Sequence, residues 1–405
     1  MPIQTPFHPR TSELNRNLDW KDWGGYFAAN SYNVVNDFEY YAFRHSAGLV
    51  DITPLFKYKV TGKDASLFLS RLMVKNIGKL KLNQATYCCW CDDRGMVIDD
   101  GTVMRFGEDE YFVTAADPSY SWFSRFIKKL DVHIEDITDS YCGLALQGPT
   151  SRDILKLMCD ADLDSLKFFW TTSAKGDGFE FKISRTGYTG DLGYELWIEN
   201  KNALKLFDAI WNAGQDYNIR MSGIAALDIA RIEAGLLMNG VDYHSSLHVL
   251  IPEQMSTPYE LGLGWTVNLH REPFLGQRAL KEEKKKGSRW STVGIDINWP
   301  DLEELYNKHG LPPHTVAGAW RQSVPIYHGQ HLSKQIGYAT SGTWSPTLKK
   351  NIAIATIEIE HAKPGTEVNF EVMVEHQRKT VRATVGKPQF FNPDRKRSIL
   401  KKTMP

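Results

Sequence analysis

The chain has 405 residues, which is long for a single hydrophobic core, and we expect two or three domains. Its 48 basic residues balance 48 acidic ones, so net charge gives no reason to expect a nucleic acid as partner. We find no run of about 18 apolar residues that would predict a membrane-spanning helix. The N-terminal segment lacks the apolar core of a signal peptide, and we therefore expect a cytoplasmic protein.

The aromatic residues near the N-terminus are unusually dense, with nine of them between Trp20 and Phe43. That many rings require a packed setting, so this segment is expected to dock onto the body of the protein.

From Leu55 the pattern indicates an α+β module. Phe56, Tyr58 and Val60 alternate with polar residues, which is the period of a half-buried strand, and Asp64 is a candidate cap for a helix through about Met73. We expect a helix from Pro118 to about Leu130. The further strands predicted here are Ala85–Cys91, Met96–Phe106, Tyr111–Ala116 and Val132–Ile137, the first two joined by a turn at 92–95.

A second module of similar plan begins at Tyr141, and the chain ends differently. The predicted elements of the second module are strands at Gly143–Leu146, Phe179–Arg185 and Tyr194–Ile198 and helices at Asn202–Ala213 and Ala225–Gly235. The last part contains strands at Thr292–Asn298, Ile352–Glu360, Glu367–Glu375 and Thr380–Val385 and hardly any helix. This pattern predicts a compact C-terminal β-domain, interpreted as an antiparallel barrel.

The cysteines and histidines do not predict a metal site. Five cysteines are too few for a disulfide scaffold, and in a strand Cys88 points away from Cys89 and Cys91, so we interpret these three as buried apolar side chains. His244 and His248 have the spacing of two ligands on a helix, but the segment between them offers no further ligand.

Adjacent carboxylates in an apolar strand are the first chemical feature. Asp99 and Asp100 follow Val97-Ile98, and their side chains must point to opposite faces, so one is expected to face the interior. An inward carboxylate requires hydrogen-bond donors or a ligand. Either it is a strand-end aspartate bonded to backbone amides, or it positions or deprotonates a substrate nitrogen.

A glycine-rich segment is the second feature. The sequence RTGYTGDLGYE, from Arg185 to Glu195, surrounds an aromatic residue with glycines. Such a segment is either a long hairpin loop or a close-packed turn where the backbone approaches a flat ligand.

Together these features resemble the glycine-cleavage T-protein (aminomethyltransferase) family. The blocks occur in family order over about residues 45–390. They are Asp99-Asp100, LQGP at 146–149, RTGYTG at 185–190, RIEAG at 231–235, TPYE at 257–260, FLG at 274–276 and TSGTWSPTL at 340–348.

The resemblance implies three domains around a central folate channel. It implies a discontinuous first domain (1–54 with 141–250), a second domain at 55–140, and a linker with the barrel at 251–405. Tetrahydrofolate is the expected cofactor, and the one-carbon donor is either a small molecule or a lipoyl carrier protein. The sequence gives no expectation for oligomeric state.

The resemblance also implies roles for individual site residues of this chain. Asp100 matches the family's catalytic carboxylate and Tyr87 a pocket tyrosine. Tyr188 and Glu195 match residues that hold the pterin, and a carboxylate suits its ring N–H donors. Thr114 stands where the family has a pocket asparagine, and Arg321 matches an arginine near the folate.

Differences between this sequence and the family's motifs affect which one-carbon donor is expected. Leu227 replaces a ligand-binding arginine, Pro54 stands where the family has a histidine, and Gly101 follows the aspartate pair in place of leucine. An insertion lies near His244–Met255. Three functions therefore stay open. They are a tetrahydrofolate-dependent aminomethyltransferase, a related demethylase acting on a methylated amine or a sulfonium compound such as dimethylsulfoniopropionate, and a non-catalytic folate-binding protein.

Overall fold

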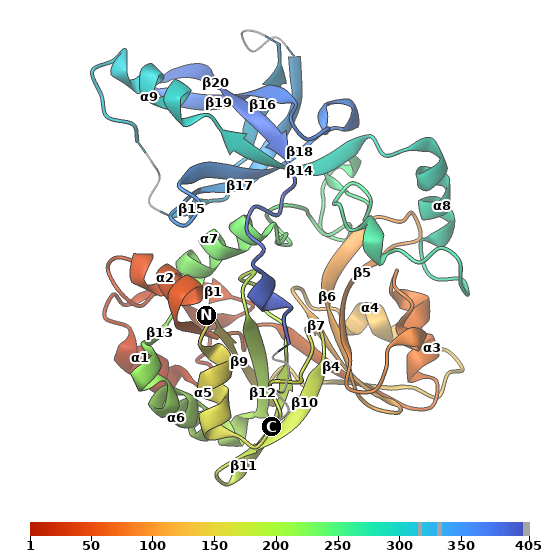
Figure 1. The fold of residues 1–405 in the computed structure, drawn as a ribbon. Helices are drawn as coiled ribbons and strands as arrows, with labels where there is room; N and C mark the ends of the chain where they lie inside the picture. Colours follow the sequence, from red (N-terminus) through yellow and green to blue (C-terminus); the bar gives the residue numbers. More distant parts are fainter. Residues whose placement is uncertain (315–317, 330–333, 400–405) are drawn as a thin grey trace.

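The computed structural model describes residues 1–314, 318–329 and 334–399. The end of the predicted third domain, 400–405, lies outside these ranges. Three large sheets organise the chain, and Figure 1 shows the C-terminal sheet set apart from the other two. Within the described ranges, no helix is long and apolar enough to cross a membrane.

The aromatic N-terminal segment packs onto the body, as predicted. Phe7, Tyr32, Tyr40 and Phe43 are buried in its hydrophobic clusters. The elements of this segment are α1 (His8–Leu14), β1 (Asp19–Trp23), β2 (Tyr26–Ser31) and α2 (Asp37–His45).

The first large sheet has six strands in the order β10-β11-β12-β9-β3-β13. Its strands are β3 (Ala47–Asp51), β9 (Tyr141–Gln147), β10 (Thr171–Gly176), β11 (Phe179–Ser184), β12 (Gly193–Glu199) and β13 (Ile219–Met221). Its helices are α5 (Ser151–Met158), α6 (Ala203–Gly214) and α7 (Ile224–Ala234). Gly235 ends α7 with φ +67°, the left-handed conformation that glycine favours at this position.

The second sheet has five strands in the order β5-β6-β7-β4-β8. They are β4 (Phe56–Thr61), β5 (Ala85–Cys91), β6 (Val97–Gly107), β7 (Glu110–Ala115) and β8 (His133–Asp136), with helices α3 (Ala65–Leu72) and α4 (Tyr120–Ser124). The helix predicted to reach Leu130 is wrong beyond Ser124. Arg125 and Phe126 make short turn bonds to Trp122 and Phe123, and Lys129 has φ +56°, which ends helical continuation.

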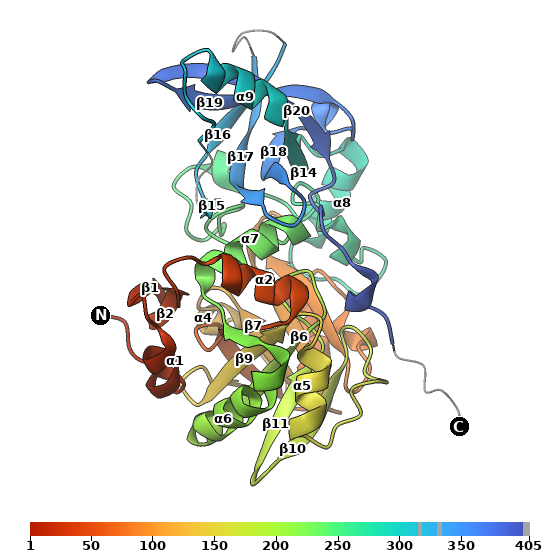
Figure 2. The ribbon, with the colours of Figure 1, turned by 60° about the vertical axis from the view of Figure 1, so that its left-hand side comes forward.

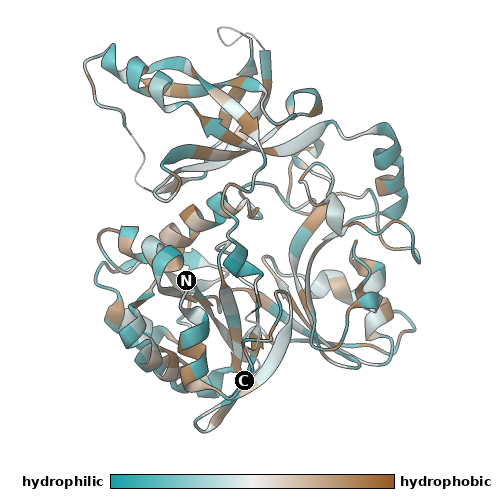
Figure 3. Cartoon of the chain, in the orientation of Figure 1, coloured by the Kyte–Doolittle hydropathy of each residue, from teal (hydrophilic) through white to brown (hydrophobic). Residues whose placement is uncertain are grey.

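A segment with little sheet structure leads to the last unit. It contains α8 (Gln277–Lys286), whose ribbon is mostly teal in Figure 3, the colour of hydrophilic residues. Its short helical turns lie at Pro252–Gln254 and Gly264–Thr266.

The C-terminal unit is a closed antiparallel barrel, as predicted. Its six strands pair in the cycle β14-β18-β17-β16-β19-β20, and β15 (Ala319–Trp320) adds to β17. They are β14 (Trp290–Ile297), β16 (Val324–His328), β17 (Lys334–Ser345), β18 (Lys350–Glu358), β19 (Glu367–Val374) and β20 (Gln377–Gly386).

One helix of this unit was not anticipated. α9 (Trp299–Asn307) begins after Asn298, whose side chain accepts the N–H of Asp301 at 2.9 Å, and Pro300 lies in its first turn. Both are ordinary start signals of a helix.

Helix α7 joins the barrel to the rest of the protein. It packs against β2 and α2 on one side and against β17 and β18 on the other, and Figure 2 shows it between the barrel and the two lower sheets. Glu233 of α7 accepts hydrogen bonds from Tyr40, Arg44 and Ser345. We propose the domain boundaries given above, since each of the three sheets falls within one of the three units.

Candidate active site

The β5–β6 hairpin carries the two central residues of the predicted site. Tyr87 pairs with Thr102, which lies two residues beyond Asp100 on β6. Alternate residues of a strand share a face, and paired residues of antiparallel strands share one as well. Tyr87 and Asp100 are therefore brought to the same face of the second sheet by strand register alone.

Asp99 is the structural member of the aspartate pair. Its carboxylate accepts the backbone N–H groups of Ala116 at 3.0 Å and Asp117 at 2.9 Å, and the side-chain amide of Asn239 at 3.0 Å. The side chain is fully buried. The strand-end interpretation considered for the pair thus describes Asp99.

Asp100 points to the opposite face and is partly exposed. The hydroxyl groups of Tyr243 and Tyr87 donate hydrogen bonds to its carboxylate. Burial raises the pKa of Asp100 above its usual value. The two tyrosine hydrogen bonds lower this pKa again, and the nearby Asp117 charge raises it. The geometry leaves a carboxylate oriented by two aromatic hydroxyls, which is suited to orienting a substrate N–H or accepting its proton.

Tyr188 lies beside this pair. Its hydroxyl donates to the backbone oxygen of Leu237, and burial raises the pKa of Tyr188 far above its usual range. Leu237 belongs to the hydrophobic cluster that contains Tyr243 and against which Tyr87 packs, so its contact with Tyr188 brings that residue to the Asp100 cluster.

Trp265 extends the aromatic surface outward from Tyr87. The two rings stack with centroids 6.0 Å apart and an interplanar angle of 23°, and Trp265 is 61% exposed. Lys75 lies over the indole, with Nζ 4.9 Å from the ring centroid. A flat ligand that reaches Asp100 would therefore meet stacked aromatic rings on this side.

Thr114 is near Asp100 but is already engaged. Its hydroxyl lies 2.7 Å from that of Thr102 and accepts the Thr102 N–H at 3.0 Å. The structure also explains Gly101, because a Cβ at that position would lie 1.9 Å from the backbone oxygen of Thr114. Glycine is required here by the close approach of β7.

Glu195 lies on β12 and has a different partner. Thr186 donates its hydroxyl to Glu195 at 2.7 Å, and burial raises the pKa of Glu195 to about 7. The carboxylate is thus held on the first sheet, on a different element from those that carry Asp100.

Arg321 belongs to a chain of buried ion pairs. It contacts Asp228 at 2.7 Å, and Asp228 also contacts Arg231 at 2.7 Å. Arg231 continues to Asp242, which accepts the hydroxyls of Thr340 and Ser341 from the barrel. Arg321 stays 34% exposed, so part of its guanidinium is available to a ligand.

Leu227 lies in the apolar surroundings of Tyr188. It is buried in the same hydrophobic cluster, with Tyr188 packed against that cluster. The side chain at 227, where the family resemblance led us to expect an arginine, therefore contributes to an apolar cluster in this chain.

Sequence reasoning missed Asn239, Tyr243 and Asp242. They lie inside the predicted first domain, after its last predicted helix, where the Asn-Gly dipeptide at 239–240 is a turn signal. Arg231 was noted within a family block without a role.

The cysteine interpretation is confirmed. Cys88, Cys89 and Cys91 are buried free thiols within hydrophobic clusters. His248 lies 3.7 Å from Asp117.

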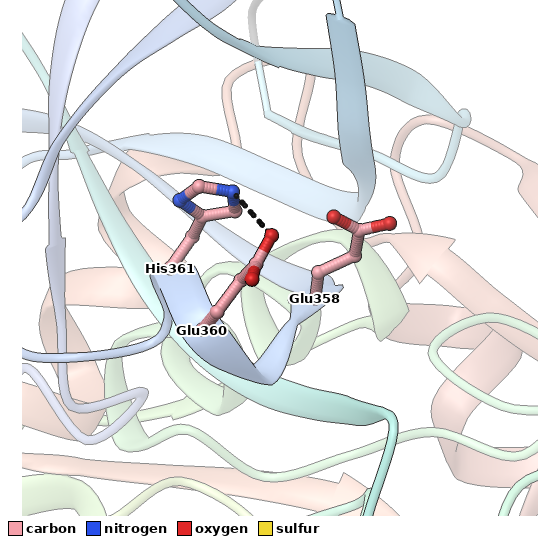
Figure 4. A group of neighbouring side chains, drawn as sticks. All are labelled: Glu358, Glu360 and His361. Carbon is pink, nitrogen blue, oxygen red and sulfur yellow. Dashed lines mark ion pairs between the residues drawn. The ribbon is translucent and has the colours of Figure 1, made fainter.

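One group of potential metal ligands lies at the end of the barrel, far along the chain from the predicted site. Figure 4 shows Glu358, Glu360 and His361, with a His361–Glu360 pair at 3.3 Å. Lys334 contacts Glu358 at 3.1 Å and Glu360 at 3.4 Å. A lysine ammonium thus already supplies positive charge to these carboxylates.

Among the hollows of the described surface are one near the aspartate pair and one at a distance from it. The smaller, of about 370 Å³, is lined by residues that include Asp117, Asn239, His244 and His248, and it adjoins the Asp99 anchor. The larger, of about 520 Å³, is lined by Lys59, Glu110, Lys182 and their neighbours. None of the predicted site residues lines either hollow, but the smaller one contains Asp117 and Asn239, which are hydrogen-bonded to Asp99.

The chain matches two family models. Residues 12–271 match the GCVT N-terminal domain, and residues 311–392 match the glycine cleavage T-protein C-terminal barrel domain.

Similar proteins cover nearly the whole chain. The aminomethyltransferase of Caldanaerobacter subterraneus subsp. tengcongensis is 34% identical over 400 residues, 97% of each chain. The trimethylamine-oxide aldolase of Ruegeria pomeroyi is 32% identical over 98% of this chain, which spans 48% of that relative. The crystal structure of aminomethyltransferase T from Bartonella henselae superposes with a TM-score of 0.80 at 22% identity, covering 97% of this chain and 99% of that one.

Proposed function

Because this chain belongs to the glycine cleavage T-protein family, we propose that it is a tetrahydrofolate-dependent one-carbon transferase with Asp100 as its catalytic carboxylate. The observation that carries the proposal is the Asp100 carboxylate, oriented by Tyr87 and Tyr243 on a partly exposed face. Such preorganisation at the reacting nitrogen is the main contribution a protein can make to this kind of transfer.

The residues present fit a reduced folate. Glu195 is a half-buried carboxylate with a hydroxyl donor from Thr186, which leaves oxygen lone pairs for ring N–H groups of a pterin. Arg231 Nη2 is buried and has no hydrogen-bond partner among the described residues, which suits a ligand carbonyl or carboxylate near Tyr188. Thr114 is proposed to line the same pocket.

The roles follow from this fit. Tetrahydrofolate supplies a nucleophilic amine nitrogen that takes up the one-carbon unit. Glu195 and Tyr188 hold the pterin, and Arg321 attracts the anionic tail through the N–H groups not bonded to Asp228. Asp100 orients the amine and accepts or stabilises its proton as the new carbon–nitrogen bond forms and the bond between carbon and donor breaks.

The proposed reaction has two versions, which differ in the one-carbon donor. An aminomethyl group on a lipoyl carrier would give methylene-tetrahydrofolate and ammonia, in keeping with the relatives named aminomethyltransferase. A methylated ammonium or sulfonium donor would give methyl-tetrahydrofolate. The Asp100 carboxylate, with the hydroxyls of Tyr87 and Tyr243 as its donors, favours a cationic donor because a carboxylate attracts positive charge. The similarity to a trimethylamine-oxide aldolase points the same way.

The test is a donor screen with purified protein and tetrahydrofolate, read by the mass of the folate product. We expect Asp100→Asn to abolish turnover while tetrahydrofolate still binds. The matched control is Asp296→Asn, which removes a carboxylate that pairs with Lys350 on the barrel. Folate binding by the wild type without turnover of any donor would instead identify a non-catalytic folate-binding protein. The cytoplasmic location stays a prediction.

A further inference from the structure

The loop of residues 236–243, which follows α7, contacts three groups of the candidate site. Its contacts are Leu237 to the hydroxyl of Tyr188, Asn239 to Asp99, and Tyr243 to Asp100. We propose that this loop positions the catalytic carboxylate relative to the folate-binding side of the site, and that Asn239 is its positioning residue. The inference rests on the proposed function for its effect on turnover, but its geometric part stands independently.

Asn239 connects two separate segments of the second sheet. Its side-chain amide donates to Asp99 of β6 at 3.0 Å and to Asp117, just after β7, at 2.9 Å. Asp99 in turn binds the N–H groups of residues 116 and 117. One amide group of the loop thus joins a network that fixes β6 to the chain leaving β7.

The loop is internally stiff, so a constraint at Asn239 reaches Tyr243. The N–H of Gly240 bonds the Tyr243 carbonyl at 2.8 Å, and the N–H of Asp242 bonds the Met238 carbonyl at 2.9 Å. Gly240 has φ +78°, which a tight turn of this kind requires. Because Asn239 and Tyr243 bind adjacent residues of β6 from one rigid turn, they hold Asp99 and Asp100 as a unit.

The same loop is anchored to the other two units through Asp242. Its carboxylate accepts Arg231 from α7 and the hydroxyls of Thr340 and Ser341 from β17 of the barrel. Asp242 also accepts the N–H of Met238 at 2.9 Å. The loop is therefore hydrogen-bonded to residues of all three domains, at the place beside Asp100 where these domains meet.

Two near-isosteric substitutions test Asn239. Asn239→Leu keeps the branched arrangement of four side-chain heavy atoms and removes both N–H donors. Asn239→Asp replaces the donor group by an acceptor beside Asp99 and Asp117. The matched control is Asn369→Leu, which removes an amide that donates to the Gly329 carbonyl on the barrel at 2.6 Å.

We expect Asn239→Leu to lower kcat by about 10- to 100-fold, because small displacements of reacting groups are costly, while the KM for tetrahydrofolate changes less than about twofold. Hydrogen exchange of the backbone amides of 116–117 and 236–243 should accelerate at least about tenfold, with the rest of the chain unchanged. Asn369→Leu should change neither quantity.

The pH dependence of kcat distinguishes the loss of a hydrogen-bond donor at position 239 from a change in side-chain packing there. Around position 239 lie Asp99 of β6, Asp117 after β7 with His248 at 3.7 Å, and Asp100 with Tyr243. The Asn239→Asp carboxyl can donate only when protonated, so its kcat should recover toward that of the wild type as pH falls from about 8 to 6. Asn239→Leu should show no such recovery.

Each outcome decides the inference. Wild-type kcat in Asn239→Leu, parallel pH profiles of the two variants, or accelerated exchange spread over the whole chain would overturn it. If the wild type transfers no one-carbon unit, the proposed function fails. The hydrogen-exchange measurement then tests the positioning contact of Asn239 by itself. Local acceleration at 236–243 would then support the positioning contact, and unchanged exchange would overturn it.

Discussion

The hydroxyl of Tyr243 donates a hydrogen bond to the carboxylate of Asp100, although 143 positions separate the two residues in the chain. Tyr243 is buried, and the same carboxylate accepts a hydrogen bond from Tyr87 of the neighbouring strand. One donor is thus supplied locally by the β5–β6 hairpin, and the other comes from the loop after α7.

Removing the Tyr243 hydroxyl should shift the acid limb of the pH–activity profile. A donor stabilises the charged carboxylate and lowers the pKa of Asp100, so Tyr243→Phe should raise that pKa further. If Asp100 works deprotonated, the acid limb of kcat/KM moves to higher pH. A hydrogen bond to a charged group contributes about 1.5–3 kcal/mol, which corresponds to about one to two pH units.

The control is Tyr327→Phe, which removes a hydroxyl that donates to Glu371 on the barrel at 2.7 Å. An acid limb that stays in place in Tyr243→Phe would show that this hydrogen bond does not tune the catalytic carboxylate.

Glu195 should make stability depend on pH. Its pKa rises from 4.5 to about 7 on burial, so the folded state binds more protons than the unfolded state between these values. The free energy of unfolding therefore falls as pH rises from about 4.5 to 7 and stays lower above that. Glu195→Gln should raise the free energy of unfolding by up to about 3 kcal/mol at pH 8, because it removes the cost of the buried charge, and have little effect at pH 4.

Urea unfolding at both pH values measures the difference, with Glu180→Gln, at an exposed position of β11, as the control. The same Glu195→Gln protein should bind tetrahydrofolate less tightly, because it loses the charged acceptor of the pterin N–H groups. Equal stabilisation at both pH values would contradict the assigned role of burial.

The fold was predictable where local pattern and tertiary setting agree. The bounds of β4 and β5 follow from the pattern, and the Asp92–Gly95 turn between β5 and β6 follows from its residue types. The helix expected to reach Leu130 ends at Ser124, because Arg125 and Phe126 make single-turn hydrogen bonds and Lys129 adopts a left-handed φ of +56°, neither of which helix propensity signals. Lys57, expected on the polar face of β4, is buried, with its ammonium bonded to the carbonyls of Thr53 and Leu55.

The site was predictable only in part, for a related reason. Asp100, Tyr87 and Tyr188 were found through the family motifs, and the structure brings them together. Strand alternation showed that Asp99 and Asp100 face opposite ways, but it could not say which faces the site. The partners that decide this, Asn239 and Tyr243, come from a loop with no periodic pattern, so only the folded chain reveals them.

Gly101 should not tolerate alanine. A Cβ would lie 1.9 Å from the backbone oxygen of Thr114, and a backbone atom within a sheet cannot move aside cheaply. We expect Gly101→Ala to lower the free energy of unfolding by about 1–3 kcal/mol or more. Gly386→Ala is the control, because the nearest atom to its Cβ lies 4.0 Å away. Equal urea midpoints for Gly101→Ala and wild type would refute the close approach of β7.

Arg321 should act on folate affinity and not on the chemical step. Its Nε is bonded to Asp228 at 2.7 Å, and its partial exposure leaves other N–H groups for a ligand carboxylate. Arg321→Met should raise the KM for tetrahydrofolate about 10- to 100-fold, as expected for the loss of one charge-assisted contact, with kcat nearly unchanged.

A folate analogue without the glutamate tail distinguishes a direct contact from an effect on the ion-pair chain. If Arg321 binds the tail carboxylate, wild type and Arg321→Met have equal KM values for the neutral amide of tetrahydropteroate, which has no carboxylate, because the contact is missing in both. If Arg321 acts by holding Asp228 and, through it, Arg231, the variant is equally impaired with the tailless analogue. Arg378→Met, which breaks a surface pair with Glu371, is the matched control and should bind both folates as the wild type does.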